Sequence, residues 1–124
     1  MPDSIVIVAA RRTPIGAFQG CLTPLGAPQL ASAAIRGAFS GLGELGREVD
    51  EAVFGCCLMA GLKQAPARQA VLGAGLPDSV PATTLTKMCG SGMKATMLVH
   101  DMLLAGSCSV GLAGGMESMS NAPY

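Results

Sequence analysis

The stretch PATTLTKMCGSGMKATMLVHDMLLAGSCSVGLAGG, residues 81–115, decides the fold. It begins with a β-branched run at 81–88, continues with an apolar helical pattern at 92–105 and ends with a second apolar run at 108–115. Gly106 follows the helical pattern, at the position where a glycine commonly ends a helix. Two strands joined by a helix require a crossover connection, so this order predicts parallel strands with the helix packed on their sheet.

The rest of the chain repeats this alternation. The runs SIVIVAA (4–10) and EAVFGCCLM (51–59) predict strands, and apolar residues at helical spacing predict helices over 30–39 and over 66–75, the second starting at a proline. The chain therefore reads as four strands alternating with three helices. This predicts an α/β fold with a mainly parallel sheet covered by helices. The helix at 92–105 is apolar on most of its circumference, so we expect it to be largely buried.

Composition limits the classes of partner. The chain has 124 residues, 50% of them apolar, with 8 basic and 8 acidic side chains, which predicts one soluble domain, or part of one. Because the charges balance, we expect no nucleic acid and no membrane as partner. The start MPDSIVIVAARR places its acidic residue before the apolar run and its basic residues after it. This is the reverse of a secretory signal, and we expect a cytoplasmic protein.

The cysteines indicate reduced thiols. Their number is odd and none of them has CxxC spacing, which argues against a disulfide framework and against a structural zinc site. We therefore expect no bound metal. At least four of the five are expected to be ordinary core residues. The five are Cys21, Cys56, Cys57, Cys89 and Cys108.

Cys89 lies where a parallel sheet gathers its chemistry. It follows the strand at 81–88 and precedes the helix at 92–105. Ligands bind at the carboxyl ends of parallel strands, and the unpaired amides of a first helical turn favour a thiolate and a developing oxyanion. Gly90 and Gly92 carry no side chain, so a thioester could approach the sulfur. Position alone leaves two interpretations open, a nucleophile and a small core residue.

A second alternative uses the same residues. Gly90, Gly92 and Ala95 spell G-x-G-x-x-A after a strand, which is typical of dinucleotide-binding oxidoreductases. The fingerprint normally follows the first strand of its domain, whereas here it follows the third. The acidic residue that should close the next strand is also misplaced, because Glu117 comes after two further glycines.

The remaining polar candidates are interpreted structurally. His100 is 11 positions from Cys89, or ~16 Å along a helix axis, which is too far for a hydrogen bond. Lys94 and Asp101 form one narrow polar stripe on the helix. Glu117 is left open between a functional carboxylate and a turn carboxylate. Four methionines are expected to fill the core, Met88, Met93, Met97 and Met102.

Four ordered motifs carry a resemblance to a known family. They are VAARRTPIGAFQG (8–20), QAPARQAVLGAGLP (64–77), KMCGSGMKA (87–95) and AGGMESMSNAPY (113–124). With these motifs the chain resembles the N-terminal part of the thiolases, in particular the acetyl-CoA acetyltransferases (acetoacetyl-CoA thiolases). The resemblance implies the N-terminal half of an architecture layered as helix, sheet, helix, sheet, helix. It also implies that Cys89 takes the acyl group as a thioester.

The resemblance further implies a reaction and its partners. Two acetyl-CoA condense to acetoacetyl-CoA and CoA, or the reverse thiolysis occurs, without a permanently bound cofactor. The implied assembly is a homo-oligomer, a dimer or a tetramer. One departure concerns Thr86, because many thiolases have asparagine three residues before the cysteine.

The resemblance also implies parts that residues 1–124 do not contain. These are a histidine in a Gly-His-Pro motif, a second catalytic cysteine, an Asn-Glu segment and a loop domain that binds coenzyme A. We therefore expect residues 1–124 to be an incomplete N-terminal thiolase domain. The alternative is a non-catalytic fragment or assembly module that needs a C-terminal thiolase chain as partner.

Overall fold

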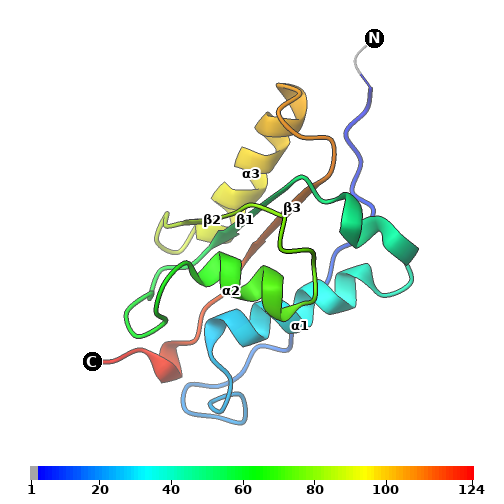
Figure 1. The fold of residues 1–124 in the computed structure, drawn as a ribbon. Helices are drawn as coiled ribbons and strands as arrows, with labels where there is room; N and C mark the ends of the chain where they lie inside the picture. Colours follow the sequence, from blue (N-terminus) through cyan, green and yellow to red (C-terminus); the bar gives the residue numbers. More distant parts are fainter. Residues whose placement is uncertain (1–2) are drawn as a thin grey trace.

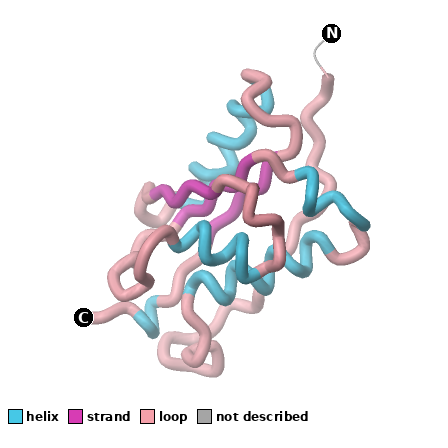
Figure 2. The backbone as a smooth tube through the Cα atoms, in the orientation of Figure 1, coloured by secondary structure: helices cyan, strands magenta, loops and turns pink. Residues whose placement is uncertain are grey.

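The computed structural model describes residues 3–124 and contains a parallel three-stranded sheet with helices on both faces. The strand order is β2-β1-β3, and Figure 2 shows these strands at the centre of the molecule. The strands are β1 (Glu51–Gly55), β2 (Ala82–Leu85) and β3 (Gly111–Gly115). The predicted α/β class with a parallel sheet is confirmed.

The helices divide between the two faces of the sheet. Figure 1 shows α1 and α2 on one side of the strands and α3 on the other. The helical elements are α1 (Ala27–Phe39), α2 (Pro66–Gly73) and α3 (Ser91–Leu104), with the short 3₁₀ helices η1 (Gly43–Glu48) and η2 (Met119–Asn121). None of the helices in residues 3–124 has the length and apolarity that a membrane crossing requires.

Local sequence sets the helix boundaries. At the start of α1, the side-chain oxygen of Gln29 accepts the N–H of Gly26 at 2.7 Å, which satisfies one of the free donors of a helix N-terminus. Both α1 and α2 have a proline in the first turn, where the missing N–H is not needed. Gly106 follows α3 with φ +72°, a backbone conformation that glycine adopts without strain.

Alternation along β1 assigns its side chains to two cores. Val53 points toward α3 and packs with Ala95 and Val99. Its neighbours Ala52 and Phe54 point the other way and join clusters with residues of α1 and α2. Strand side chains alternate between faces, so a strand buried on both faces has a continuous apolar run, as β1 does.

One predicted strand is wrong. Residues 4–10 form no strand, and in the described part of the chain their backbone pairs with no other segment. Both edges of β1 are already occupied by β2 and β3, so the segment would need the outer edge of one of those strands. Its β-branched side chains are largely in solvent, Ile7 being 84% exposed. A β-branched run predicts extended backbone, but a strand also has to lie beside a sheet edge, and residues 4–10 pair with neither outer edge of the sheet.

The expected burial of the third helix is also not found in this chain. Only Ser91, Ala95 and Val99 of α3 are buried, whereas Met93, Met97 and Leu104 are exposed. Periodicity shows that a helix is apolar all round, but burial requires a neighbour on each side, and within residues 3–124 α3 packs mainly on β1 and β3. The expectation that α3 is covered in an assembled protein stays a prediction.

Candidate active site

Cys89 lies in the connection between β2 and α3 with its side chain exposed. The residue after it, Gly90, is the N-cap of α3. Since β2 ends at Leu85, a short loop separates the cysteine from the strand, although sequence patterning placed Cys89 one residue beyond it. The structure thus places Cys89 at the carboxyl edge of the sheet and beside a helix N-terminus.

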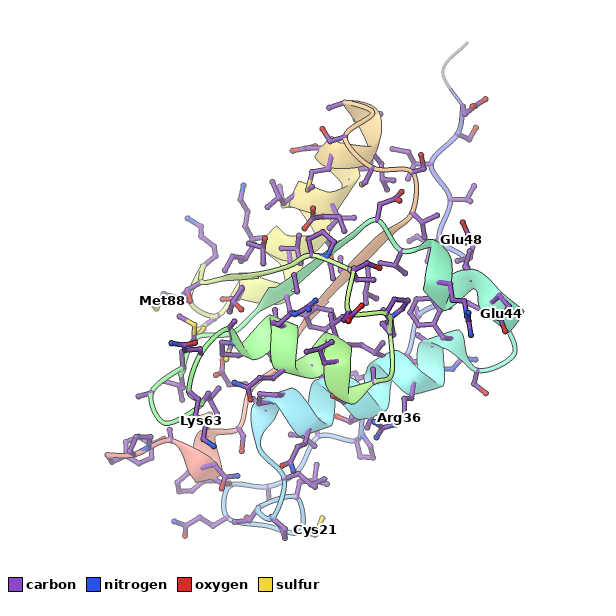
Figure 3. The ribbon with its side chains drawn as sticks, viewed as in Figure 1. Cys21, Arg36, Glu44, Glu48, Lys63 and Met88 are labelled. Carbon is purple, nitrogen blue, oxygen red and sulfur yellow. The ribbon has the colours of Figure 1, made fainter. Side chains whose placement is uncertain are left out.

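A hydrogen-bonded turn fixes the loop that carries Cys89. The hydroxyl of Ser91 accepts the N–H of Lys87 at 2.9 Å and donates to the carbonyl of Met88 at 2.6 Å. Met88 has φ +45°, a left-handed conformation that costs a residue with a side chain roughly 1–2 kcal/mol. Met88 is 70% exposed and lies at the margin of the molecule in Figure 3, so its side chain is not core filler.

Two strand glycines allow α3 to pack closely on the sheet. A Cβ on Gly115 would lie 2.9 Å from the Cα of Gly92, and a Cβ on Gly55 would lie 2.3 Å from the carbonyl carbon of Ser91. The first turn of α3 therefore rests directly on the ends of β1 and β3. The sequence predicted that Gly92 leaves room for a substrate. In the structure a Cβ on Gly92 would meet the Cα of Gly115 at 3.4 Å, an ordinary contact, so the packing itself requires glycine at Gly55 and Gly115.

Glu117 organises the loop that follows β1. Its two carboxylate oxygens accept the N–H groups of Cys57 at 2.9 Å and of Leu58 at 2.8 Å, and the thiol of Cys56 lies 3.6 Å from one of them. Of the two interpretations left open for this residue, the turn carboxylate describes the contacts. The loop it holds brings the thiol of Cys57 against the carbonyl of Met88 and within 3.4 Å of the Ser91 hydroxyl.

Thr86 makes a contact that the sequence left in doubt. Thr86 is the first residue after the end of β2, and its hydroxyl donates to the carbonyl of Cys56 at 2.6 Å. The backbone N–H of Cys56 in turn donates to the carbonyl of Leu85 at 3.0 Å. The threonine therefore ties the start of the Cys89 loop to the chain leaving β1.

Two amides are available beside the cysteine. In the first turn of α3, the N–H groups of Gly92 and Met93 meet no acceptor among the described residues. Such donors point out of a helix N-terminus and, with the helix dipole, favour negative charge. The arrangement suits a thiolate or an oxyanion placed before Ser91.

An open cleft of about 1080 Å³ lies in front of the cysteine. Its walls come from the segment before α1, from α1 itself, from the loop after β1 and from the segment after β3. Apolar and polar groups both line it, among them Ile15, Phe18, Cys57, Met93 and Glu117. The cleft is wide enough to hold part of a ligand against Cys89 and is not closed by residues 3–124.

Of the other four thiols, only Cys56 and Cys108 are buried, so the expectation of at least four core cysteines is wrong. Burial, with the nearby charge of Glu117, raises the pKa of Cys56 to about 12. Burial is also the main cause that raises the pKa of Cys108, with smaller effects from Asp50 and Glu51. Cys21 is exposed, but it lies in the loop before α1, at the bottom of the view in Figure 3.

The remaining charged candidates stay outside this arrangement. His100 is exposed, with its Nδ1 3.4 Å from a carboxylate oxygen of Asp101, and neither residue lines the cleft. Lys94 is also exposed. Among the described residues, no three His, Cys, Asp or Glu side chains are grouped so that they could hold a metal ion.

Sequence reasoning missed Ser91 and Cys57, and it misread Met88. Ser91 lies between Gly90 and Gly92, which were interpreted in its place. Its contacts with Lys87 and Met88 form only when the chain turns. Cys57 approaches the site from a different strand end. One signal was available, because a small hydroxyl residue at the start of a helix commonly bonds nearby backbone groups.

Comparison with known proteins identifies the family. The family model of the thiolase N-terminal domain matches residues 5–124. The chain belongs to the thiolase family. It is 55% identical to the mitochondrial acetyl-CoA acetyltransferase of Bos taurus over 98% of this chain and 29% of that protein. The corresponding values are 56%, 97% and 28% for the Homo sapiens protein and 54%, 98% and 29% for that of Danio rerio.

These relatives correct two expectations about this thiolase. All three are named as mitochondrial proteins, so the expectation of a cytoplasmic location is wrong. The charges around the first apolar run argue against a secretory signal, but they do not distinguish the cytoplasm from the mitochondrion. Membership of the thiolase family also removes the support for the dinucleotide-binding alternative. The chain spans under a third of the length of the relatives it matches, 29% for the Bos taurus protein.

Proposed function

We propose that this chain supplies the acyl-accepting half of an acetyl-CoA acetyltransferase, with Cys89 as the nucleophile. The observation that carries the proposal is the exposed thiol of Cys89 at the N-terminus of α3, facing the cleft. The names of the relatives support acetyl-CoA as substrate. On this proposal residues 1–124 form an N-terminal thiolase domain, and the loop domain and C-terminal domain of the enzyme lie outside them.

The proposed reaction begins with transfer of an acetyl group to the cysteine. The Cys89 thiolate attacks the thioester carbonyl of acetyl-CoA, and the carbonyl oxygen becomes an oxyanion. When the C–S bond to coenzyme A breaks, the electron pair leaves with the CoA sulfur, which takes up a proton. The product is a thioester between Cys89 and the acetyl group, together with free CoA.

The second step forms a carbon–carbon bond. A base removes a proton from the methyl group of a second acetyl-CoA, and the resulting enolate attacks the acetyl-enzyme carbonyl. Acetoacetyl-CoA leaves as the Cys89 thiolate is released. In the reverse direction, coenzyme A cleaves acetoacetyl-CoA through the same acetyl-enzyme. His100 is exposed and does not line the cleft. We propose that this base and the group that activates the thiol belong to the part of the enzyme outside residues 1–124.

The free amides of α3 support the first step. The N–H groups of Gly92 and Met93, three and four residues after Cys89, meet no acceptor in the described residues. Donors already oriented before the reaction stabilise an oxyanion without reorganising. We propose that they, with the helix dipole, favour the Cys89 thiolate and the oxyanion formed at its carbonyl partner.

The proposal also includes an assembly. The outer side of α3 and the segment 4–10 both present large apolar side chains to water, among them Met93, Leu104 and Ile7, and contiguous apolar surface of this kind commonly marks an interface. We propose that they pack on the remaining thiolase polypeptide, either in one chain or as a separate C-terminal chain. A homo-oligomer, dimer or tetramer, completes the proposed enzyme.

A Cys89→Ser exchange tests the proposed function. The test protein is a chimera in which residues 1–124 replace the matching segment of the Bos taurus relative. We expect the unsubstituted chimera to form an acetyl-enzyme with acetyl-CoA, detected as a mass increase on the peptide that contains Cys89. Cys89→Ser should abolish that adduct and reduce thiolysis of acetoacetyl-CoA by about 10³-fold or more.

Cys21→Ser is the matched control, because this thiol is also exposed but lies on another loop. It should leave both the adduct and the turnover unchanged. An acetyl group found on Cys21 or Cys57, or full turnover by the Cys89→Ser chimera, would refute the assignment.

A further inference from the structure

The segment that follows β3 is hydrogen-bonded to one wall of the cleft. We propose that Asn121 is a positioning residue, which holds the loop before α1 against this segment and thereby limits the length of the acyl chain that fits in front of Cys89. This loop, residues 15–25, is named the wall loop. The inference rests on the proposed function, in which the cleft receives the acyl group. It assigns acyl-chain selectivity to a residue that does not itself line the cleft.

Asn121 joins two segments that lie far apart in the sequence. Its side-chain nitrogen Nδ2 donates to the carbonyl of Thr23 at 2.9 Å and to the carbonyl of Leu25 at 3.0 Å. The hydroxyl of Ser118 lies 2.8 Å from the same nitrogen. No backbone N–H of the described residues donates to either carbonyl. The link therefore depends on the side-chain amide, because carbonyls only accept and need a donor opposite them.

Within residues 3–124, every hydrogen bond that leaves the wall loop ends on residues 118–121. Besides the bonds of Asn121, the hydroxyl of Ser120 accepts the N–H of Gln19 at 2.7 Å. The other hydrogen bonds of the loop are internal, such as the bond from the N–H of Thr23 to the carbonyl of Gly20 at 3.1 Å. Figure 1 shows η2 beside the loop before α1. The segment after β3 is thus the anchor of the wall loop.

The wall loop presents apolar side chains to the cleft. Ile15, Phe18 and Leu22 line the cleft together with Cys89. Ile15 is 80% exposed and Phe18 is 59% exposed, so packing against the rest of the chain does little to hold them. Their position follows the backbone of the loop, which its bonds to residues 118–121 hold in place. Apolar side chains of this kind are the usual lining for an apolar part of a ligand.

The same segment is also fixed to a second wall of the cleft. Glu117 accepts the N–H groups of Cys57 and Leu58, and both residues line the cleft. The thiol of Cys57 in turn contacts the carbonyl of Met88, the residue before the nucleophile. Residues 117–121 therefore connect the wall loop with the loop that lies against the Cys89 turn. Their bonds set the separation of these two walls.

The consequence concerns which acyl chains the cleft accepts. Without the amide of Asn121, the wall loop keeps only the bond of Gln19 and the weaker contact of Ser118 with Leu25. The loop can then move away from the second wall. A cleft rejects a longer chain only as far as its walls resist displacement, so a loosened wall discriminates less between chain lengths.

The main test is Asn121→Ala in the chimera with the Bos taurus relative. The measurement is kcat/KM for thiolysis of acetoacetyl-CoA, divided by kcat/KM for 3-oxohexanoyl-CoA, whose acyl chain is longer. We expect this ratio to fall by about fivefold, because the longer chain gains access. The KM for acetoacetyl-CoA should rise by about threefold while kcat changes by less than about twofold, since the nucleophile is untouched.

Tyr124→Phe is the matched control. The Tyr124 hydroxyl donates to the carbonyl of Met119 at 3.1 Å, so its loss removes a hydrogen bond within the same segment but none to the wall loop. Tyr124 does not line the cleft. The selectivity ratio of Tyr124→Phe should equal that of the unsubstituted chimera. A fall as large as that of Asn121→Ala would overturn the proposal, because any weakening of the segment would then have the same effect.

Hydrogen exchange tests the attachment itself. The peptide that covers residues 17–25 should exchange faster in Asn121→Ala and at the unchanged rate in Tyr124→Phe, because only the first variant releases the wall loop. Equal exchange in the two variants would overturn the anchoring role. Faster exchange with an unchanged selectivity ratio would overturn the effect on the substrate.

Ser120→Ala is the milder second variant, since it removes the acceptor of Gln19 and keeps the amide of Asn121. It should lower the selectivity ratio in the same direction by a smaller factor. If Asn121→Ala gives no folded chimera, Ser120→Ala decides, and an unchanged ratio would then overturn the proposal.

The outcomes separate this inference from the proposed function. If the Cys89→Ser chimera keeps its turnover, the proposed function fails, whatever the selectivity ratios are. If that chimera loses turnover and Asn121→Ala keeps the selectivity of the unsubstituted chimera, Cys89 is the nucleophile and only the positioning role of Asn121 fails.

Discussion

The two faces of the sheet are covered to different extents. On one face, α1 and α2 enclose a continuous core that includes Ile35, Phe54 and Ala70. On the other, α3 buries Ala95 and Val99 against Val53 and leaves its outer methionines in solvent. Both faces are built from apolar helices. The difference shows that an apolar helix is buried only on the sides where a neighbour exists.

The N-terminal segment repeats this lesson for a strand. Residues 4–10 have the composition of a buried strand, yet Val6, Ile7 and Val8 are exposed. Figure 1 shows this part of the chain as an extended trace outside the three paired strands. Segment 4–10 and the outer side of α3 are both apolar, and neither is covered by other parts of residues 3–124.

The largest expected effect is on activity, and it tests whether the incompletely covered α3 face needs the rest of the enzyme. Purified residues 1–124 should show negligible thiolysis of acetoacetyl-CoA, at least about 10³-fold below the chimera, because members of a catalytic set are strongly non-additive. Mixing with the C-terminal remainder of the Bos taurus relative should recover activity. The measurement is the loss of acetoacetyl-CoA absorbance with each part alone and with the mixture.

The remainder alone is the control in this experiment, and it should be inactive because it lacks Cys89. Substantial turnover by residues 1–124 alone would mean that the base lies within this chain. In that case α3 and its surroundings would form a complete site, and the contrast between the faces would have no functional meaning.

A smaller effect is expected from matched truncations on the two faces. Ile35→Ala should lower the free energy of unfolding by about 2–5 kcal/mol, because Ile35 is 2% exposed and its removal leaves a cavity. Met97→Ala on α3 removes a side chain of similar size that is 53% exposed, and it should change stability by about 0.5 kcal/mol or less. Urea denaturation of both variants gives the comparison. Similar losses would show that α3 is covered in solution.

The smallest expected effect concerns the hydrogen bonds that join the residue before β1 to the two residues before β3. Asp50 accepts the N–H groups of Ser109 and Val110 at 2.7 and 3.0 Å, and these bonds hold the pKa of Asp50 below its ordinary value. A lowered pKa contributes stability that is present above the ordinary value and is lost as the pH falls through the lowered one.

The wild-type chain should therefore lose stability below about pH 4 more steeply than Asp50→Asn, whose side chain does not titrate in this range. Urea midpoints between pH 6 and pH 3 provide the measurement. Parallel curves for the two proteins would show that the link between Asp50 and the start of β3 contributes nothing.

Much of the fold follows from local sequence. Pro66 and the glycine after α3 mark helix boundaries that the structure confirms within a few residues, because turns and first helical positions depend on a residue's own backbone preferences. The strand at 4–10 could not be judged in this way, since pairing depends on where the segment lies relative to a sheet edge. The same limit applies to the burial of α3, which depends on neighbours and not on the helix itself.

The candidate site was predictable only in part. The location of Cys89 between a strand and a helix follows from the pattern, and its function rests on the family. The contacts of Ser91, Cys57 and Glu117 join three strand ends, and no local pattern records them. Met88 shows the limit most directly, because its left-handed backbone arises from bonds to its carbonyl and not from its side chain.

The contact between α3 and β3 has a consequence for the mutational tolerance of the chain. A Cβ at Gly115 would come within 2.9 Å of Gly92, and Gly55 has no room for one either. A Cβ at Gly92 would lie 3.4 Å from its nearest neighbour, so position 92 should accept alanine. In a saturation mutagenesis screen, positions 55 and 115 should tolerate almost no residue but glycine, as strictly as the nucleophile itself. A screen scored on activity would group them with the catalytic residues, whereas a screen scored on abundance would assign them to the fold and leave Cys89 tolerant.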